Sequence, residues 1–128
     1  MALNYYKNEL KENAQLLASK GKGILAVDES TKTVGKRLAG IGVDNTEENR
    51  KAYRGMLFTT EGLGKYISGA ILFEETLYQN HQDGESMVKK LNDLGIIPGI
   101  KVDKGLNPLP GGGDVETFCS GLDGLVER

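Results

Sequence analysis

Charged residues follow three apolar runs of this sequence, and each run has the length of a β-strand. The charged groups are Asp28-Glu29, Glu74-Glu75, and Lys101 with Asp103-Lys104. In parallel α/β folds, ligands bind at the carboxyl ends of the strands, because loops and helix N-termini converge there. We therefore expect a small-molecule site at this edge of a sheet. The alternative is that these charges only mark the points where strands reach solvent.

Lys101 is the most informative of these residues. It lies in an apolar run between Ile100 and Val102, so it shares a strand face with Asp103. An unpaired ammonium on a covered sheet face is very costly, so Lys101 must pair with a carboxylate or bind an anion. Together with the strand-end carboxylates, it indicates chemistry on a small anionic substrate. The alternative is a lysine that faces solvent from an edge strand.

Helices and strands alternate along the chain and must position these residues. Apolar residues at spacings of three and four predict helices near residues 4–20, 45–58 and 85–94. The expected apolar stripe of the middle helix is Ala52, Tyr53, Met56 and Leu57, and Asn45 with Glu48 resembles its N-terminal cap. A short polar helix is expected at 34–38.

Continuous apolar runs predict strands at 23–27, 67–73 and 96–103, of the kind buried on both faces of a parallel sheet. The Pro/Gly-rich stretch 107–114 is expected to be a loop, and a last helix is expected from about residue 121. The order β-α-β-α-β predicts an α/β fold with parallel strands and right-handed crossovers.

Composition excludes several classes of protein. The 128 residues include 16 Lys and Arg against 18 Asp and Glu, a net charge of −2 that gives no basic nucleic-acid footprint. No apolar stretch approaches the roughly 20 residues that span a bilayer. The lone Cys119 excludes an internal disulfide framework and suits a reducing compartment. We expect one intracellular domain, or part of one, with neither nucleic acid nor membrane as partner.

Three weaker patterns predict no site. Gly111–Gly113 lacks the Lys-Ser/Thr of a phosphate loop, and His81 has no second His or Cys nearby for a metal. The charged run Glu47–Lys51 is typical of a solvated helix face. We expect no metal ligand and no cofactor.

Long blocks of the chain resemble class I fructose-bisphosphate aldolases. The match runs in order from about residue 5 to the end, and its blocks are Gly23–Thr31, Lys36–Leu38, Asn45–Arg50, Ile71–Gln79, Gly99–Gly105 and Gly121–Leu125. The segment Tyr66–Glu75 is most similar to plant- and plastid-type members.

The resemblance implies an eight-stranded (β/α)₈ TIM barrel, usually a homotetramer. Such enzymes cleave fructose 1,6-bisphosphate to dihydroxyacetone phosphate and glyceraldehyde 3-phosphate in glycolysis and gluconeogenesis, through a lysine Schiff base and without a metal. Because such a barrel takes about 250 residues, residues 1–128 would form the N-terminal portion of a single barrel domain, with about three strands.

Site residues carry over individually from the resemblance. Asp28 corresponds to the family's active-site aspartate, and the substrate-binding positions are Ser30, Thr33, Arg37, Arg50 and Lys101. Ser30, Thr33 and Lys101 match contacts to substrate phosphate. The chain departs from many members at Lys32-Thr33, where they carry Gly-Ser; the hydroxyl is retained, but the lysine adds bulk to the loop.

The family's Schiff-base lysine, its partner lysine and its proton-transferring glutamate match positions beyond Arg128. We therefore expect the 128-residue chain alone to be inactive. One alternative is a non-catalytic fragment or assembly partner of the barrel, and another is a different sugar-phosphate barrel enzyme. The lack of a transit segment favours the cytoplasm, whereas the plastid-like blocks favour the plastid stroma.

Overall fold

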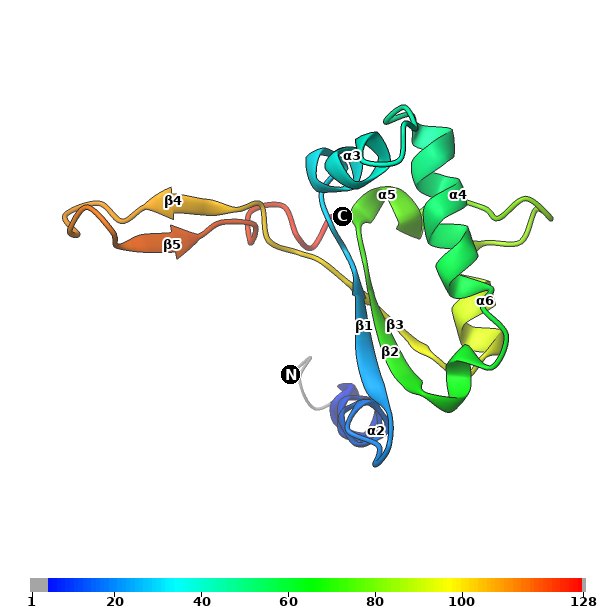
Figure 1. Cartoon of the computed structure of the whole chain (residues 1–128). Helices are drawn as coiled ribbons and strands as arrows, with labels where there is room; N and C mark the ends of the chain where they lie inside the picture. The colour runs from blue at the N-terminus through cyan, green and yellow to red at the C-terminus, as the bar shows by residue number, and fades with distance from the viewer. Residues whose placement is uncertain (1–4, 128) are drawn as a thin grey trace.

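A three-stranded parallel sheet forms the centre of the molecule, a computed structural model that describes residues 5–127. Its strands, in spatial order, are β1 (Gly23–Val27), β2 (Ile67–Leu72) and β3 (Ile97–Ile100). Val27 pairs with Leu72, and Leu72 pairs with Ile100, so the three carboxyl ends are level (Figure 1). The predicted parallel α/β arrangement is confirmed.

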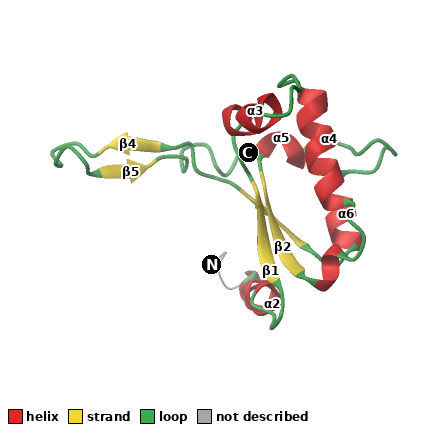
Figure 2. Ribbon diagram, in the orientation of Figure 1, coloured by secondary structure: helices red, strands yellow, loops and turns green. Residues whose placement is uncertain are grey.

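The helices surround this sheet on one face and at both of its ends (Figures 1 and 2). They are α2 (Lys7–Leu17), α3 (Thr31–Ala39), α4 (Glu47–Phe58), α5 (Glu74–Leu77) and α6 (Met87–Asp93), with a 3₁₀ turn, η1, at Leu63–Lys65. α4 and α6 cover one face, α3 and α5 lie at the carboxyl edge, and α2 lies at the amino end. None of the helices within residues 5–127 is long and apolar enough to cross a membrane.

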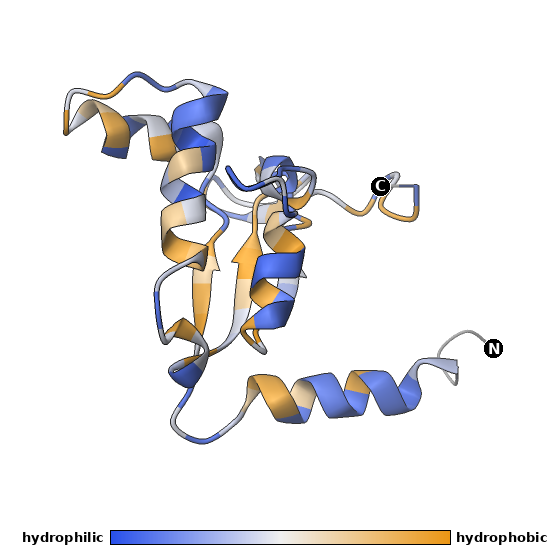
Figure 3. Ribbon diagram, turned by 90° about the vertical axis from the view of Figure 1, so that its right-hand side faces the viewer, coloured by the Kyte–Doolittle hydropathy of each residue, from blue (hydrophilic) through white to orange (hydrophobic). Residues whose placement is uncertain are grey.

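The hydrophobic core lies between the sheet and the layer of α4 and α6. Its buried members are Val27, Phe58, Ala70, Leu72, Met87, Leu91 and Ile96. Figure 3 shows largely hydrophobic strands beside two helices that carry both hydrophobic and hydrophilic residues. Amphipathic helices on an apolar sheet are the expected way to bury this area.

The opposite face of the sheet is open, which contradicts the expectation that the first strand is buried on both faces. Val27 is 1% exposed, but Ile24 is 53% exposed. Only α2 approaches this face, at its amino end, where Leu17 lies so close to Gly69 that a Cβ there would come within 2.3 Å of Leu17 Cδ2. No other element of the described chain covers it.

Two helix starts differ from the prediction because side-chain caps decide them. α3 begins at Thr31 rather than residue 34, since the Ser30 hydroxyl accepts a hydrogen bond from the Thr33 amide. α4 is capped by Thr46, which accepts from the Asn49 amide, rather than by Asn45 with Glu48. Both are the usual arrangement of a hydroxyl before the first turn.

The buried side of α4 also differs from the predicted stripe. Met56, expected in the core, is 60% exposed. The helix buries Arg50, Arg54, Gly55 and Phe58 instead. Two arginines can occupy this side because a carboxylate, Glu75, meets them there.

The C-terminal stretch corrects two further expectations. The stretch 107–114, predicted as a loop, begins inside β4 (Leu106–Pro108), and β4 pairs antiparallel with β5 (Thr117–Cys119) in a hairpin that extends away from the sheet (Figure 1). The helix expected from residue 121 is absent from residues 121–127, of which 123–127 form turns. Gly121 and Gly124 adopt φ values of 134° and 67°, which an α-helix does not accommodate.

Replacing Phe58, a core residue with 0% exposure, should destabilise the protein strongly. We expect Phe58→Ala to lower the free energy of unfolding by about 3–5 kcal/mol, because it removes apolar burial and leaves a cavity. Met56→Ala, in the same helix but exposed, should change it by about 0.5 kcal/mol or less. Urea unfolding of the complete polypeptide measures both, and equal losses would contradict the observed orientation of α4.

Candidate functional site at the carboxyl edge of the sheet

The strand ends bring the predicted charged residues to one edge. Asp28 follows β1, Glu74 and Glu75 follow β2, and Lys101 follows β3. The Lys101 amide donates to the Leu72 carbonyl at 2.9 Å, which extends the pairing of β3 with β2 as far as the site. Side chains from three separate strand ends therefore share one rigid frame.

Lys101 lies between two carboxylates. Its Nζ is 2.7 Å from Asp103 Oδ1 and 3.4 Å from Asp28 Oδ2. Asp103, and then Asp28, raise the pKa of Lys101, while Lys101 lowers the pKa of Asp103. The lysine is thus paired with carboxylates, one of the two states expected of it, although β3 ends at Ile100 and does not extend over the predicted 96–103.

A cavity of about 370 Å³ opens beside this lysine. It is lined by Ser30, Phe73, Glu74, Lys101, Asp103, Lys104 and Gly105. Its volume lies in the range of small-molecule sites, and its amines suit an anionic group. Among the described residues, no group of three or more His, Cys, Asp or Glu side chains could hold a metal ion.

The predicted phosphate contacts Ser30 and Thr33 lie together at the N-terminus of α3. Their hydroxyl oxygens are 3.1 Å apart, and Ser30 also caps the helix. A helix N-terminus favours a negative charge because its first amides are unpaired and its dipole is positive there. Ser30 lines the same cavity as Lys101, so one anion could reach both a hydroxyl and an amine.

Arg37 extends from α3 toward the turn that follows β1 and toward α4. It forms an ion pair with Glu29 and donates a hydrogen bond to the Tyr53 hydroxyl at 3.1 Å. Its side chain remains 55% exposed. The structure therefore leaves the predicted substrate arginine accessible, although it does not line the cavity of Lys101.

Arg50 is in a different environment from the other predicted residues. Its guanidinium donates to both carboxylate oxygens of Glu75 and to the main-chain and side-chain oxygens of Asn45. Its residue exposure is 8%. The structure does not bring Arg50 to the lysine cavity, and its role as a substrate contact remains a prediction.

Sequence reasoning missed Arg54, which completes this buried cluster. Arg54 is 0% exposed and lies one helical turn after Arg50, so it faces the same carboxylate, Glu75. Burial lowers the pKa of Arg54, whereas Arg50 lowers the pKa of Glu75. The only sign of this cluster in the sequence is the spacing of four residues between the two arginines, which places them on one side of a helix.

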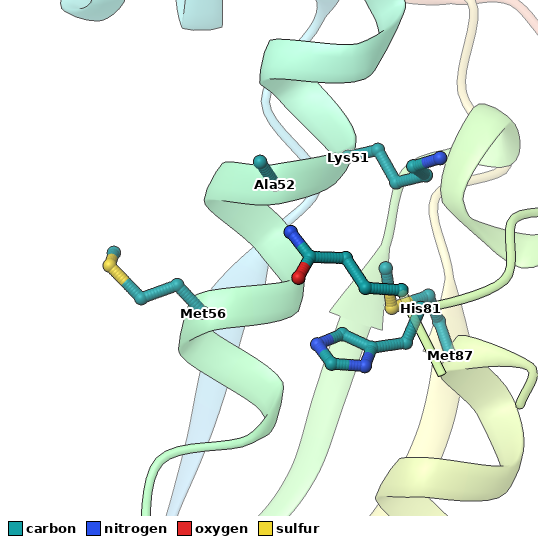
Figure 4. A pocket seen from close by; sticks show the side chains of 6 residues that line it. Lys51, Ala52, Met56, His81 and Met87 are labelled. Carbon is teal, nitrogen blue, oxygen red and sulfur yellow. The ribbon is translucent and has the colours of Figure 1, made fainter. Parts of the chain in front are cut away.

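A second pocket, of about 200 Å³, lies between α4, the loop at His81 and the start of α6 (Figure 4). Its lining residues are Lys51, Ala52, Met56, His81, Gln82 and Met87. It contains none of the predicted site residues. The carboxyl edge is therefore the better candidate for chemistry.

A family model described as fructose-bisphosphate aldolase class-I matches residues 9–128. The chain belongs to this family. Fructose-bisphosphate aldolase 3 of Arabidopsis thaliana is 62% identical over 123 residues, which are 96% of this chain and 31% of the relative. The fructose-bisphosphate aldolase of spinach, Spinacia oleracea, is 61% identical over 123 residues, again 96% of this chain and 31% of the relative.

A solved structure agrees with these sequence matches. It is fructose-bisphosphate aldolase of Plasmodium falciparum, described in a ternary complex with TRAP and a small-molecule inhibitor. The similarity has a TM-score of 0.89 at 58% identity and covers 94% of this chain and 35% of that one. The chain thus spans about a third of the length of the aldolases that it matches.

The two plant relatives are both described as chloroplastic. Their names favour the plastid alternative and do not support the cytoplasmic expectation.

Removing the lysine amine should change the titration of Asp103. We expect Lys101→Met to raise the pKa of Asp103, because the ammonium that favours its ionised form is lost. Nuclear magnetic resonance of the carboxyl carbon measures this shift. Asp83, whose pKa of about 2 depends first on Lys90, is the internal control and should not move. An unchanged Asp103 pKa would contradict the observed pairing.

Proposed function

We propose that the protein carrying this chain cleaves fructose 1,6-bisphosphate to dihydroxyacetone phosphate and glyceraldehyde 3-phosphate through a lysine Schiff base. The observation that carries the proposal is the strand-end cluster of Asp28, Lys101 and Asp103 in a chain of the class I aldolase family. A carboxylate beside an amine, at the ligand-binding edge of parallel strands, suits a sugar phosphate.

We propose further that residues 5–127 form the first three strands of a (β/α)₈ barrel. The strands are parallel and neighbour one another in chain order, as in that fold. The open sheet face and the unpaired outer edges of β1 and β3 would be covered by further strands. A homotetramer and a plastid location complete the proposal; the names of the plant relatives support the location.

Lys101 would bind a substrate phosphate with help from Ser30 and Thr33. The phosphate would take over the charge that Asp103 now neutralises, and the hydroxyls at the start of α3 would donate to its oxygens. Losing one charge-assisted contact costs about 1.5–3 kcal/mol. Lys101→Met should therefore weaken binding of the bisphosphate about ten- to a hundredfold.

Asp28 would act on the reacting part of the sugar. Cleaving the carbon–carbon bond requires that a proton leave a substrate hydroxyl, and the cationic imine needs a nearby anion. The place of the Asp28 carboxylate at the end of β1, beside the Lys101 amine, supports either role.

The covalent step distinguishes an active enzyme from a non-catalytic fragment. We expect the complete polypeptide to cleave fructose 1,6-bisphosphate and to lose activity when treated with borohydride and dihydroxyacetone phosphate, since reduction fixes the imine. A polypeptide of residues 1–128 should show no adduct by intact mass. An adduct on any lysine of residues 1–128 in either polypeptide would contradict the assignment.

Replacing Asp28 should slow catalysis without unfolding the protein. We expect Asp28→Asn and Asp28→Ala to reduce turnover by about 10²–10⁴-fold, the range for one acid–base group. Single-turnover cleavage measures the rate, and thermal melting of each variant reports the fold. Near-normal cleavage by Asp28→Asn would make Asp28 a structural strand-end residue.

A further inference from the structure

Glu75 lies where two arginines of α4 meet the end of β2. Arg50 donates from Nε and Nη2 to the two oxygens of its carboxylate, and Arg54 donates from Nη1 at 3.0 Å. The side chains of Arg50 and Arg54 are 10% and 0% exposed. Charges this deeply buried are tolerated only when they are paired, so Glu75 holds both arginines in place.

Arg54 extends this contact to the end of β1. Its Nη2 donates to the main-chain carbonyl of Glu29 at 2.8 Å, and its guanidinium carbon lies 5.3 Å from the centre of the Phe73 ring. The planar guanidinium is therefore held by Glu75, by the Glu29 carbonyl and by an aromatic ring. Such a fork can bind two oxygens at fixed angles, which a lysine cannot do.

The carbonyl that Arg54 binds belongs to the peptide between Glu29 and Ser30. That peptide lies in the turn from β1 into α3. Asp28 comes directly before Glu29, and Ser30 is the cap of α3. On its other side Asp28 follows Val27, which pairs with Leu72 in the sheet, and its carboxylate is 3.4 Å from Lys101 Nζ. Asp28 thus lies between two anchored residues: Val27 in the sheet before it, and Glu29 after it, whose carbonyl accepts from the arginine that Glu75 orients.

We propose that Glu75 is a positioning residue for the cleavage reaction: through Arg54 it fixes the Glu29–Ser30 peptide, and with it Asp28. This inference rests on the proposed function. Glu74, the neighbour of Glu75, lines the cavity beside Lys101, but Glu75 does not. Glu75 acts on the site through Arg54 and not by touching substrate.

The first test is Glu75→Gln in the complete polypeptide. The change keeps the shape but replaces one acceptor oxygen with a donor that faces the arginines. We expect kcat/KM for fructose 1,6-bisphosphate to fall about ten- to a hundredfold, the usual consequence of a small misplacement of a reacting group. Arg54→Lys, which keeps the charge but not the fork, should act in the same direction and serves if Glu75→Gln does not fold.

A double-mutant cycle separates positioning from a general loss of stability. In an Asp28→Asn background, adding Glu75→Gln should cost less than about threefold, since the group that it positions is already gone. The matched control is Ser68→Ala at the amino end of β2, where a hydroxyl with a residue exposure of 4% donates to the Leu17 and Gly23 carbonyls. It should lower the melting temperature and leave kcat/KM unchanged.

Amide hydrogen exchange tests the same contact without reference to activity. The amides of Thr33 and Val34 donate to the Ser30 carbonyl. They should exchange faster in Glu75→Gln and at the normal rate in Ser68→Ala, because only the first change releases the turn.

Equal losses of kcat/KM from Glu75→Gln in both backgrounds would overturn the positioning role, as would unchanged exchange. If Asp28→Asn alone keeps full turnover, it is the proposed role of Asp28 that fails. The exchange measurement then still decides whether Glu75 holds the turn.

Discussion

The carboxylate of Glu75, placed against two buried arginines, is the interaction on which the site geometry depends. Taking a charge out of water costs several kcal/mol per ion, and the cost is offset only where the partner geometry is good. Arg54 has no exposed surface, and its partners are Glu75, the Glu29 carbonyl and the Phe73 ring. Because these partners follow two different strands, one buried charge fixes the two strand ends relative to each other.

The hydrophobic core holds the strands of the sheet together and does not contribute side chains to the site. Seven buried side chains between the sheet and the layer of α4 and α6 hold the strands together, whereas the other face of the sheet leaves Ile24 largely exposed. The β4–β5 hairpin also exposes apolar side chains, among them Leu106 and Phe118. Exposed apolar area and open strand edges require cover. In the proposed barrel, the remaining strands would provide it for the sheet.

The ion pairs of Lys101 at the carboxyl edge affect how an anionic ligand would bind there. Lys101 is held by Asp103 and Asp28, so its ammonium is already oriented and its single positive charge meets two carboxylates. In the proposed enzyme, an arriving phosphate would have to compete with these carboxylates, which would lower the net gain from the new contact. Only a group with enough charge to displace Asp103 would then bind well.

The sequence by itself determined the order of parallel strands, the charges at their ends and the need for Lys101 to find a partner. These features depend on local hydrophobic runs and on the cost of burying an ammonium, both visible without a fold. The long aldolase-like blocks also identified the family, which the match over residues 9–128 confirms. The tertiary structure alone decided which side of α4 is buried. Sequence patterns treat arginine as a surface residue, so the apolar spacing predicts a buried Met56 and gives no reason to bury Arg54. Arg54 can be buried only because Glu75, 21 residues later, meets it across the fold, and no local pattern records a partner at that distance.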